Sequence, residues 1–168
     1  NRQILTQIDI PNIARKIDVR TSYLREFQTT EQFDSVLYID VIEHILDEQT
    51  ELEIAQSFLK KGGHLIILVP AHNFLYNEFD QSIGHRRRYK KKMLRNLVPK
   101  QLEQQRLIYL DSLGLLASLA NKLILKQSYP SLKQIRFWDR TIVPASKMID
   151  TLSFYLIGKS LLGIWKNI

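Results

Sequence analysis

The sequence predicts a single α/β domain in which helices cover a parallel sheet to give three layers. Two apolar runs, residues 33–39 and 64–69, are typical of strands buried on both faces of such a sheet. A segment with helical spacing lies between them, and a strand, a helix and a strand in so few residues predict a right-handed βαβ unit. The length of 168 residues and the 45% hydrophobic content fit one domain with one core.

The boundaries of this unit follow from local signals. The first strand closes on the carboxylate of Asp40. The helix is predicted to begin at Asp47, to carry lysines in its last turn and to be stopped by Gly62-Gly63. The second strand is predicted to end at Pro70, because a residue without an N–H ends ladder pairing.

Weaker periodic patterns flank this unit on both sides. They predict, in order, a helix over 1–8, a strand over 17–20, a helix over 90–97, a strand over 107–110, helices over 112–126 and 138–152, and a last edge strand over 160–165.

The charge balance narrows the class of partner. There are 24 Lys and Arg against 17 Asp and Glu, a net charge of +7, which favours an anionic substrate, nucleic acid or a membrane surface. The chain has no Cys, which excludes disulfides, thiolate metal sites and cysteine nucleophiles and favours a cytoplasmic location. No apolar run reaches membrane-spanning length. Without an initial Met or a signal peptide, we expect the chain to begin inside a longer protein.

Polar clusters follow both central strands. Asp40-Val41-Ile42-Glu43-His44 comes after the first, and Pro70-Ala71-His72-Asn73 after the second. Ligands of open α/β sheets bind outside the carboxyl ends of the strands, so the two clusters are predicted to converge on one crevice. The alternatives are a carboxylate that caps a helix and a histidine that is only a hydrogen-bonded structural residue.

These residues carry a resemblance to a known family. Residues 33–45 (FDSVLYIDVIEHI) and 59–65 (LKKGGHL) resemble the fourth strand, the following helix and the fifth strand of class I S-adenosylmethionine-dependent methyltransferases. The segments 70–72 (PAH), 79–80 (FD), 84–89 (GHRRRY) and 158–160 (GKS) resemble one bacterial branch, which usually has a Tyr where Arg86 stands. The resemblance extends from about Val19 to the end of the chain.

The resemblance implies a Rossmann-like fold, S-adenosylmethionine as cofactor, and site residues that match the family's motifs. Asp40 matches the position that faces the methyl donor and the acceptor, and Pro70, Ala71 and His72 match the acceptor-facing loop. The residues that match positions beside the cofactor are Val41, Ile42 and His44 and, against the adenine, Ser22, Tyr23 and Leu24, although the acidic residue that many relatives have there is missing.

One part of the family pattern is absent. None of the six glycines forms the glycine-rich turn that holds the methionine part of the cofactor, and Asp9 is better explained as a loop residue than as the ribose-binding carboxylate. We therefore expect a methyltransferase domain that lacks its first βαβ unit. Such a domain would expose sheet edges and is predicted to dimerise, swap or aggregate.

Two chemical roles remain to be assigned. Transfer to a hydroxyl needs a base, for which His72 is the first candidate and His44 the second, the alternative for His72 being a hydrogen bond to a loop carbonyl. Asp40, Glu43 and His44, with His72 or His85, also offer metal ligands. Because Glu43 and His44 are adjacent and are expected to point in different directions, we predict no metal.

The basic run Arg86–Lys92 is either a solvated face or a site for anionic groups of an acceptor. Its candidate substrate-binding residues are His85, Arg86, Arg87, Arg88 and Tyr89. Residues 86–152 are predicted to form the substrate side, in which 112–126 either covers the sheet or forms an interfacial helix for a lipid-linked acceptor. The predicted function is methyl transfer to a small-molecule, sugar or lipid-linked acceptor, with a possible homodimer and peripheral membrane contact. The alternatives are a non-catalytic interaction module and, ranked last, a nucleic-acid-binding domain.

Overall fold

The computed structural model describes residues 23–122 and 131–168. In chain order the elements are η1 (Leu24–Glu26), β1 (Phe33–Ile39), η2 (Ile42–His44), α2 (Glu48–Ser57), β2 (Leu59–Pro70), η3 (Asn73–Leu75), α3 (Glu78–Ser82), α4 (Lys91–Leu97), β3 (Leu102–Leu110), α5 (Ser112–Ala120), α6 (Leu132–Phe137), the π-helix η5 (Trp138–Ile142), α7 (Val143–Leu152) and β4 (Ser160–Asn167).

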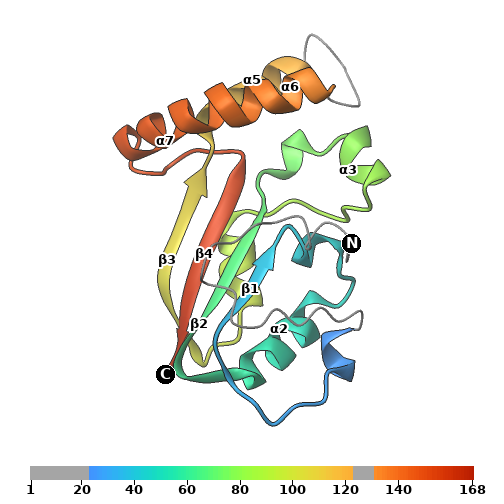
Figure 1. Cartoon of the computed structure of the whole chain (residues 1–168), viewed down its shortest axis with the longest axis vertical. Helices are drawn as coiled ribbons and strands as arrows, with labels where there is room; N and C mark the ends of the chain where they lie inside the picture. The colour runs from blue at the N-terminus through green and yellow to red at the C-terminus, as the bar shows by residue number, and fades with distance from the viewer. Residues whose placement is uncertain (1–22, 123–130) are drawn as a thin grey trace, which may run out of the picture.

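The described strands form one sheet in the order β1-β2-β4-β3 (Figure 1). β1 and β2 are parallel, as the predicted βαβ unit requires, whereas β4 is antiparallel to both β2 and β3. β3 therefore runs in the same direction as β1 and β2. The prediction that residues 160–165 form an edge strand is wrong, since β4 lies inside the sheet. Its Leu161 and Trp165 are buried, and the Trp165 indole lies where a Cβ on Gly163 would be.

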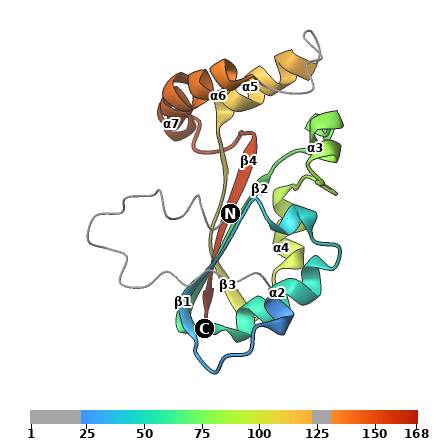
Figure 2. The ribbon, with the colours of Figure 1, turned by 45° about the vertical axis from the view of Figure 1, so that its right-hand side comes forward.

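Helices α2 and α4 cover one face of the sheet (Figure 2). Leu65, Ile67 and Val69 of β2 are fully buried on this side. On β1 the alternate residues Leu37 and Ile39 are 57% and 46% exposed. The expectation that this strand is buried on both faces is therefore wrong. Residues 23–122 and 131–168 do not form the third layer of the predicted sandwich on the face of β1 that carries Leu37 and Ile39.

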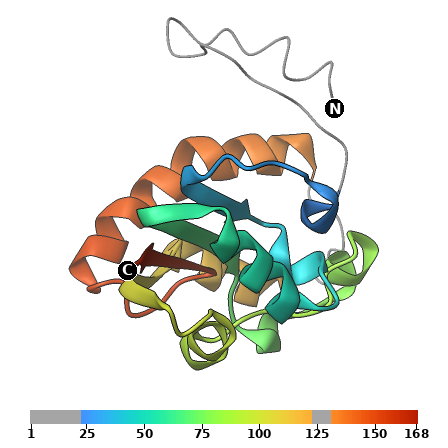
Figure 3. The ribbon, with the colours of Figure 1, turned by 90° about the horizontal axis from the view of Figure 1, so that it is seen from below.

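Helices α5, α6 and α7 form a row across the end of the sheet at which β3 ends and β4 begins (Figure 1). Figure 3 shows this row from the opposite end of the sheet, with α2 and α4 on one side of the strands. None of the helices in the described residues is long and apolar enough to cross a membrane.

The helix between β1 and β2 ends earlier than predicted. α2 ends at Ser57 and β2 begins at Leu59, so the lysines expected in the last helical turn belong to the strand. One of them, Lys60, pairs with Asp34 of β1 at 2.9 Å. Gly62, with a φ of 83°, lies inside β2 rather than at a helix end. The glycine pair therefore bends a strand, where the sequence had suggested a helix stop.

The second half contains longer elements than the periodicity indicated. β3 begins at Leu102, five residues before the predicted strand. The helical run that includes Trp138 begins at Leu132, because Ser131 and Gln134 form a capping box ahead of it. Helix α4 confirms the prediction for 90–97 within one residue. The elements predicted over 1–8 and 17–20, and the end of the helix predicted over 112–126, lie outside the described residues.

Candidate functional site

The carboxyl ends of the three strands that run in one direction each carry a strained residue. Asp40 follows β1 with a φ of 50°, His72 follows β2 with a φ of 61°, and Asp111 follows β3 with a φ of 63°. A non-glycine residue in this region costs roughly 1–3 kcal/mol and is concentrated at functional sites. The strained residues therefore lie at the carboxyl ends of the strands, where the sequence also places the two polar clusters.

The imidazole of His72 has one nitrogen engaged and one without a partner. The ring hydrogen-bonds the backbone of Gly158, while Nε2 is buried and has no hydrogen-bond partner in the described structure. Nδ1 is thus the nitrogen that donates to the Gly158 carbonyl, since a carbonyl oxygen only accepts. The two interpretations of His72 are compatible, because one nitrogen holds a loop carbonyl and the other remains available.

The surroundings of His72 keep its ring neutral and fixed. Burial lowers the pKa of His72, and the positive charges of Lys90 and Arg88 lower it further, against the Gly158 hydrogen bond. The ring stacks on Tyr109 with centroids 4.7 Å apart and also contacts Phe74 at 5.2 Å. A neutral imidazole with its proton on Nδ1 presents Nε2 as a proton acceptor.

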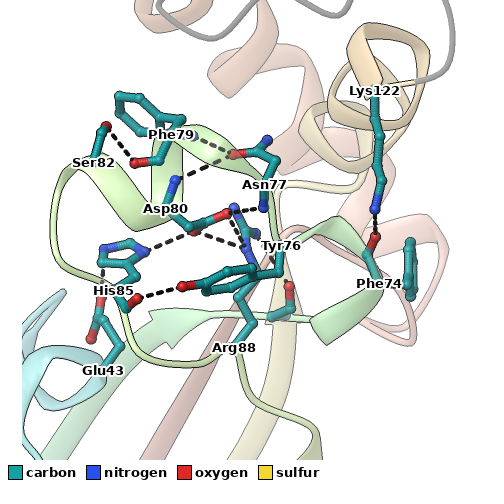
Figure 4. A network of polar contacts seen from close by, with 11 residues as sticks. Glu43, Phe74, Tyr76, Asn77, Phe79, Asp80, Ser82, His85, Arg88 and Lys122 are labelled. Carbon is teal, nitrogen blue, oxygen red and sulfur yellow. Dashed lines mark hydrogen bonds and ion pairs between the residues drawn. The ribbon is translucent and has the colours of Figure 1, made fainter.

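A buried ionic network connects η2 to α3 and the basic run (Figure 4). His85 lies between two fully buried carboxylates, with Nδ1 2.8 Å from Asp80 Oδ1 and Nε2 3.5 Å from Glu43 Oε1. Arg88 donates to both oxygens of Asp80 from Nε at 3.0 and 3.1 Å. Tyr76 donates its hydroxyl proton to the His85 carbonyl at 2.7 Å. The sequence analysis did not identify this network.

Glu43 is the least satisfied member of this network. Neither carboxylate oxygen has a hydrogen-bond partner on another described residue, and the side chain is fully buried. Burial first, and then the negative charges of Asp40 and Asp80, raise the pKa of Glu43 to about 7, against the opposing effects of its own backbone N–H and of Arg88. Glu43 therefore changes charge near neutral pH.

Two residues of this network, Glu43 and His85, could hold a metal ion together with His44. Glu43, His44 and His85 each offer one ligand atom, and these atoms all lie within 4.8 Å of one another. The expectation that Glu43 and His44 point too far apart to share an ion is wrong. The mixed oxygen and imidazole donors suit a divalent cation. The absence of a metal stays a prediction.

The predicted cofactor residues divide into exposed and buried ones. Asp40, Val41 and His44 are exposed at the end of β1, whereas Ile42 is fully buried in the core, so the Ile42 side chain supports the site from behind. Tyr23 is exposed, with the Arg25 guanidinium 5.0 Å from its ring centroid, and Leu24 packs against the core. Ser22 lies outside the described residues.

Most of the predicted substrate residues are engaged inside the protein. Tyr89 is fully buried and donates to Glu48 at 2.5 Å, so its prediction as a substrate-binding residue is wrong. Arg87 pairs with Glu48 and Arg88 with Asp80. Pro70 is buried in the sheet. Arg86 is exposed beside η2, where its Nε donates to the His44 carbonyl at 3.1 Å.

Two further residues, Lys159 and Asp111, lie near the carboxyl ends of the strands and were not predicted as site residues from the sequence. The pKa of Lys159 is lowered by burial and by Arg88, while Asp111, Asp40 and Asp80 oppose the shift, and Nζ lies 4.3 Å from the Trp138 ring centroid. Asp111 caps α5 by accepting from Gly114 N at 2.9 Å, and it also accepts from Ser146 at 2.7 Å. The rule applied to the first two strand ends would have found Asp111, because it follows the predicted strand 107–110.

The comparisons with known proteins identify the fold. No known protein-family profile matches the sequence. The chain is 37% identical to the human protein named ubiquinone biosynthesis O-methyltransferase, mitochondrial, over 59 residues, which are 34% of this chain and 16% of that protein. It superposes with a TM-score of 0.51 on a candidate sarcosine dimethylglycine methyltransferase from Galdieria sulphuraria, at 13% identity over 88% of this chain and 57% of the other.

A third relative limits what the fold implies. The 4+2 cyclase SpnF superposes with the same TM-score of 0.51, at 13% identity over 88% of this chain and 54% of its own. The chain therefore has the Rossmann-like α/β fold of the class I methyltransferases and spans little more than half the length of these structures. Because the fold also occurs in a protein named a cyclase, the reaction must be argued from the site.

Proposed function

We propose that the chain forms the acceptor side of an S-adenosylmethionine-dependent methyltransferase that acts on a hydroxyl group of a small-molecule, sugar or lipid-linked acceptor. The observation that carries the proposal is the buried Nε2 of His72, which has no partner and stands at the carboxyl end of β2. The name of the human relative, an O-methyltransferase, supports a hydroxyl acceptor over an amine.

Methyl transfer to a hydroxyl requires two things of the protein: to position the acceptor oxygen and to remove its proton. S-adenosylmethionine, when bound, supplies the methyl group from its sulfonium. Holding the acceptor oxygen in line with that group supplies much of the acceleration. His72 Nε2 accepts the hydroxyl proton as the oxygen becomes a nucleophile, and the Gly158 carbonyl keeps the ring in the required tautomer.

The residues for the two ligands lie on different strand ends. Asp40, Val41 and His44 would contact the cofactor, with Tyr23 and Leu24 (and Ser22, outside the described structure) against its adenine. Arg86 beside η2 and Lys159 near Asp40 provide positive charge for an anionic acceptor. His44 remains the second candidate for the base.

The test is transfer of a labelled methyl group from S-adenosylmethionine to a panel of phenols, sugars and lipid-linked hydroxyl compounds, with the chain extended upstream to the natural start of the protein, because the 168 residues have no glycine-rich turn. We expect transfer to at least one hydroxyl acceptor and its loss in His72→Gln. A non-catalytic interaction module would show no transfer with any acceptor. A nucleic-acid-binding domain would instead bind oligonucleotides with an affinity that falls steeply with salt, an outcome that the internal pairing of Arg87 and Arg88 disfavours.

A further inference from the structure

The turn that follows α7 displays apolar side chains on a strained backbone. Leu152, Phe154 and Leu156 are 73%, 81% and 66% exposed. Phe154 and Tyr155 have φ values of 52° and 57°, two successive non-glycine residues in the left-handed region. Strain of this kind persists only where the surrounding structure enforces it.

Hydrogen bonds enforce the shape of this turn. Tyr155 N donates to the Asp150 carbonyl at 2.8 Å, and Phe154 N donates to the Thr151 carbonyl at 3.1 Å. The Tyr155 carbonyl in turn accepts from Tyr109 N of β3 at 3.1 Å. The turn is thus anchored to both the helix and the sheet, and this anchored backbone holds Phe154 outward.

The outer face of α7 continues the same surface. Ser146 and Asp150 are buried and mark the inner face of the helix, while Met148 and Leu152, four residues apart, lie on the outer face. These two, together with Phe154 and Leu156, which follow within four residues of the end of α7, are the four exposed apolar residues here named the α7 tip. Exposed apolar side chains gathered in this way mark interaction surfaces, unlike single scattered ones.

Within residues 106–159 the exposed charges nearest the α7 tip are positive. Lys147 is exposed on α7 itself, the guanidinium of exposed Arg106 lies 5.5 Å from the Tyr155 ring centroid, and exposed Arg136 and Arg140 come shortly before α7 in the chain. Asp111 and Asp150 accept hydrogen bonds inside the α5–α7 row. Asp139 is the one exposed acid of the described residues in this stretch.

We propose that the α7 tip docks the protein on an anionic lipid bilayer. Phe154, Leu152 and their neighbours enter the interfacial region, while Lys147 and Arg106 lie against the headgroups. The row α5–α7 stands at the carboxyl end of β3, so a docked protein holds its strand-end site on the side of the membrane (Figure 1). This inference goes beyond the proposed function, because docking does not require methyl transfer.

Vesicle co-sedimentation of the 168-residue chain tests the proposal. We expect binding to phosphatidylcholine vesicles that contain phosphatidylglycerol, much weaker binding to phosphatidylcholine alone, and release at high salt. Phe154→Gly should lower the partition coefficient at least tenfold, because a buried aromatic side chain is lost. Its Tm should stay the same or rise, since glycine adopts a positive φ without strain. Lys147→Gln should lower the partition coefficient about fivefold.

Ile168→Ser is the matched control, because Ile168 is also an exposed apolar residue, at 68%, but lies at the opposite end of the molecule (Figure 1). It should leave binding unchanged. The proposal is overturned if the chain binds neither kind of vesicle, if Phe154→Gly binds like the unchanged chain, or if Ile168→Ser weakens binding as much. Self-association that Phe154→Gly abolishes, without vesicle binding, would assign the α7 tip to a second copy of the chain instead.

Discussion

His72 combines a strained backbone with a ring that is fixed at one nitrogen and open at the other. The sequence identified this residue, because it follows an apolar strand that ends in Pro70-Ala71. The tautomer was not predictable, since it depends on a carbonyl 86 positions further along the chain, at Gly158. Long-range contacts of this kind leave no local pattern.

The first prediction concerns the base. His72→Gln should reduce kcat by roughly 10²–10⁴-fold, because no group is left to take the hydroxyl proton. The rate of the protein without this substitution should fall when the pH is lowered below the pKa of His72. Burial holds this pKa under the ordinary value of 6.5. His64→Gln, on the same strand, is the control and should retain activity. Equal rates for the two variants would remove His72 from the mechanism.

The second prediction concerns Glu43, whose pKa rises from 4.5 to about 7 in the folded protein. Between these values the folded state holds a proton that the unfolded state has released, so the free energy of unfolding should fall as the pH rises from about 4.5 to about 7. The total change should be on the order of 3 kcal/mol. Urea unfolding over this pH range measures it.

Glu43→Gln should flatten this dependence, because the amide resembles the protonated carboxyl. Glu103→Gln, at an exposed position on β3, should leave the pH dependence unchanged. A slope that persists in Glu43→Gln would mean that another group of the network is responsible for it.

Among the elements, the βαβ unit was predicted well because apolar runs and a helical stripe are local signals. The position of β4 was not, since an apolar strand with alternating burial looks the same at an edge and in the interior of a sheet. Gly62-Gly63 was misread for a related reason. A glycine with positive φ ends a helix as readily as it bends a strand, and the pairing of Lys60 with Asp34 that favours the strand lies in the tertiary structure.

The third prediction concerns the contact between the end of β3 and the segment before β4. A Cβ on Gly158 would lie 2.2 Å from the Leu110 carbonyl oxygen, a backbone atom that cannot move aside cheaply. Gly158→Ala should therefore lower the free energy of unfolding by about 3 kcal/mol and disturb the carbonyl that holds His72. Gly62→Ala meets no atom within 4 Å and should lose only about 1–2 kcal/mol from its positive φ. Urea unfolding of both variants compares them, and equal losses would contradict the close approach.

At the scale of the whole molecule, the described sheet leaves β1 at an edge with apolar residues exposed. Leu37 and Ile39 face away from α2 and α4, on the side where residues 23–122 and 131–168 form no third layer. This arrangement is compatible with the expectation of a missing βαβ unit, which stays a prediction.

The fourth prediction follows from this edge. The chain should self-associate with rising concentration, because β1 is an edge strand of the described sheet and lies next to exposed apolar residues, which favours pairing with another chain. Leu37→Lys should shift sedimentation velocity profiles toward the monomer, whereas Leu46→Lys, at an exposed position outside the sheet, should not. A purified chain that is monomeric at every concentration would contradict the prediction.

The central claim is that the carboxyl ends of β1 and β2 belong to a methyl-donor site. Calorimetric titration of S-adenosyl-L-methionine tests it most directly, with the 168-residue chain and with a form extended upstream to the natural start of the protein. The account predicts binding by the extended form and weaker binding when Asp40 is replaced by Ala, with the unextended chain binding poorly because it has no glycine-rich turn. Failure of both forms to bind would contradict the methyltransferase proposal and favour a non-catalytic interaction module.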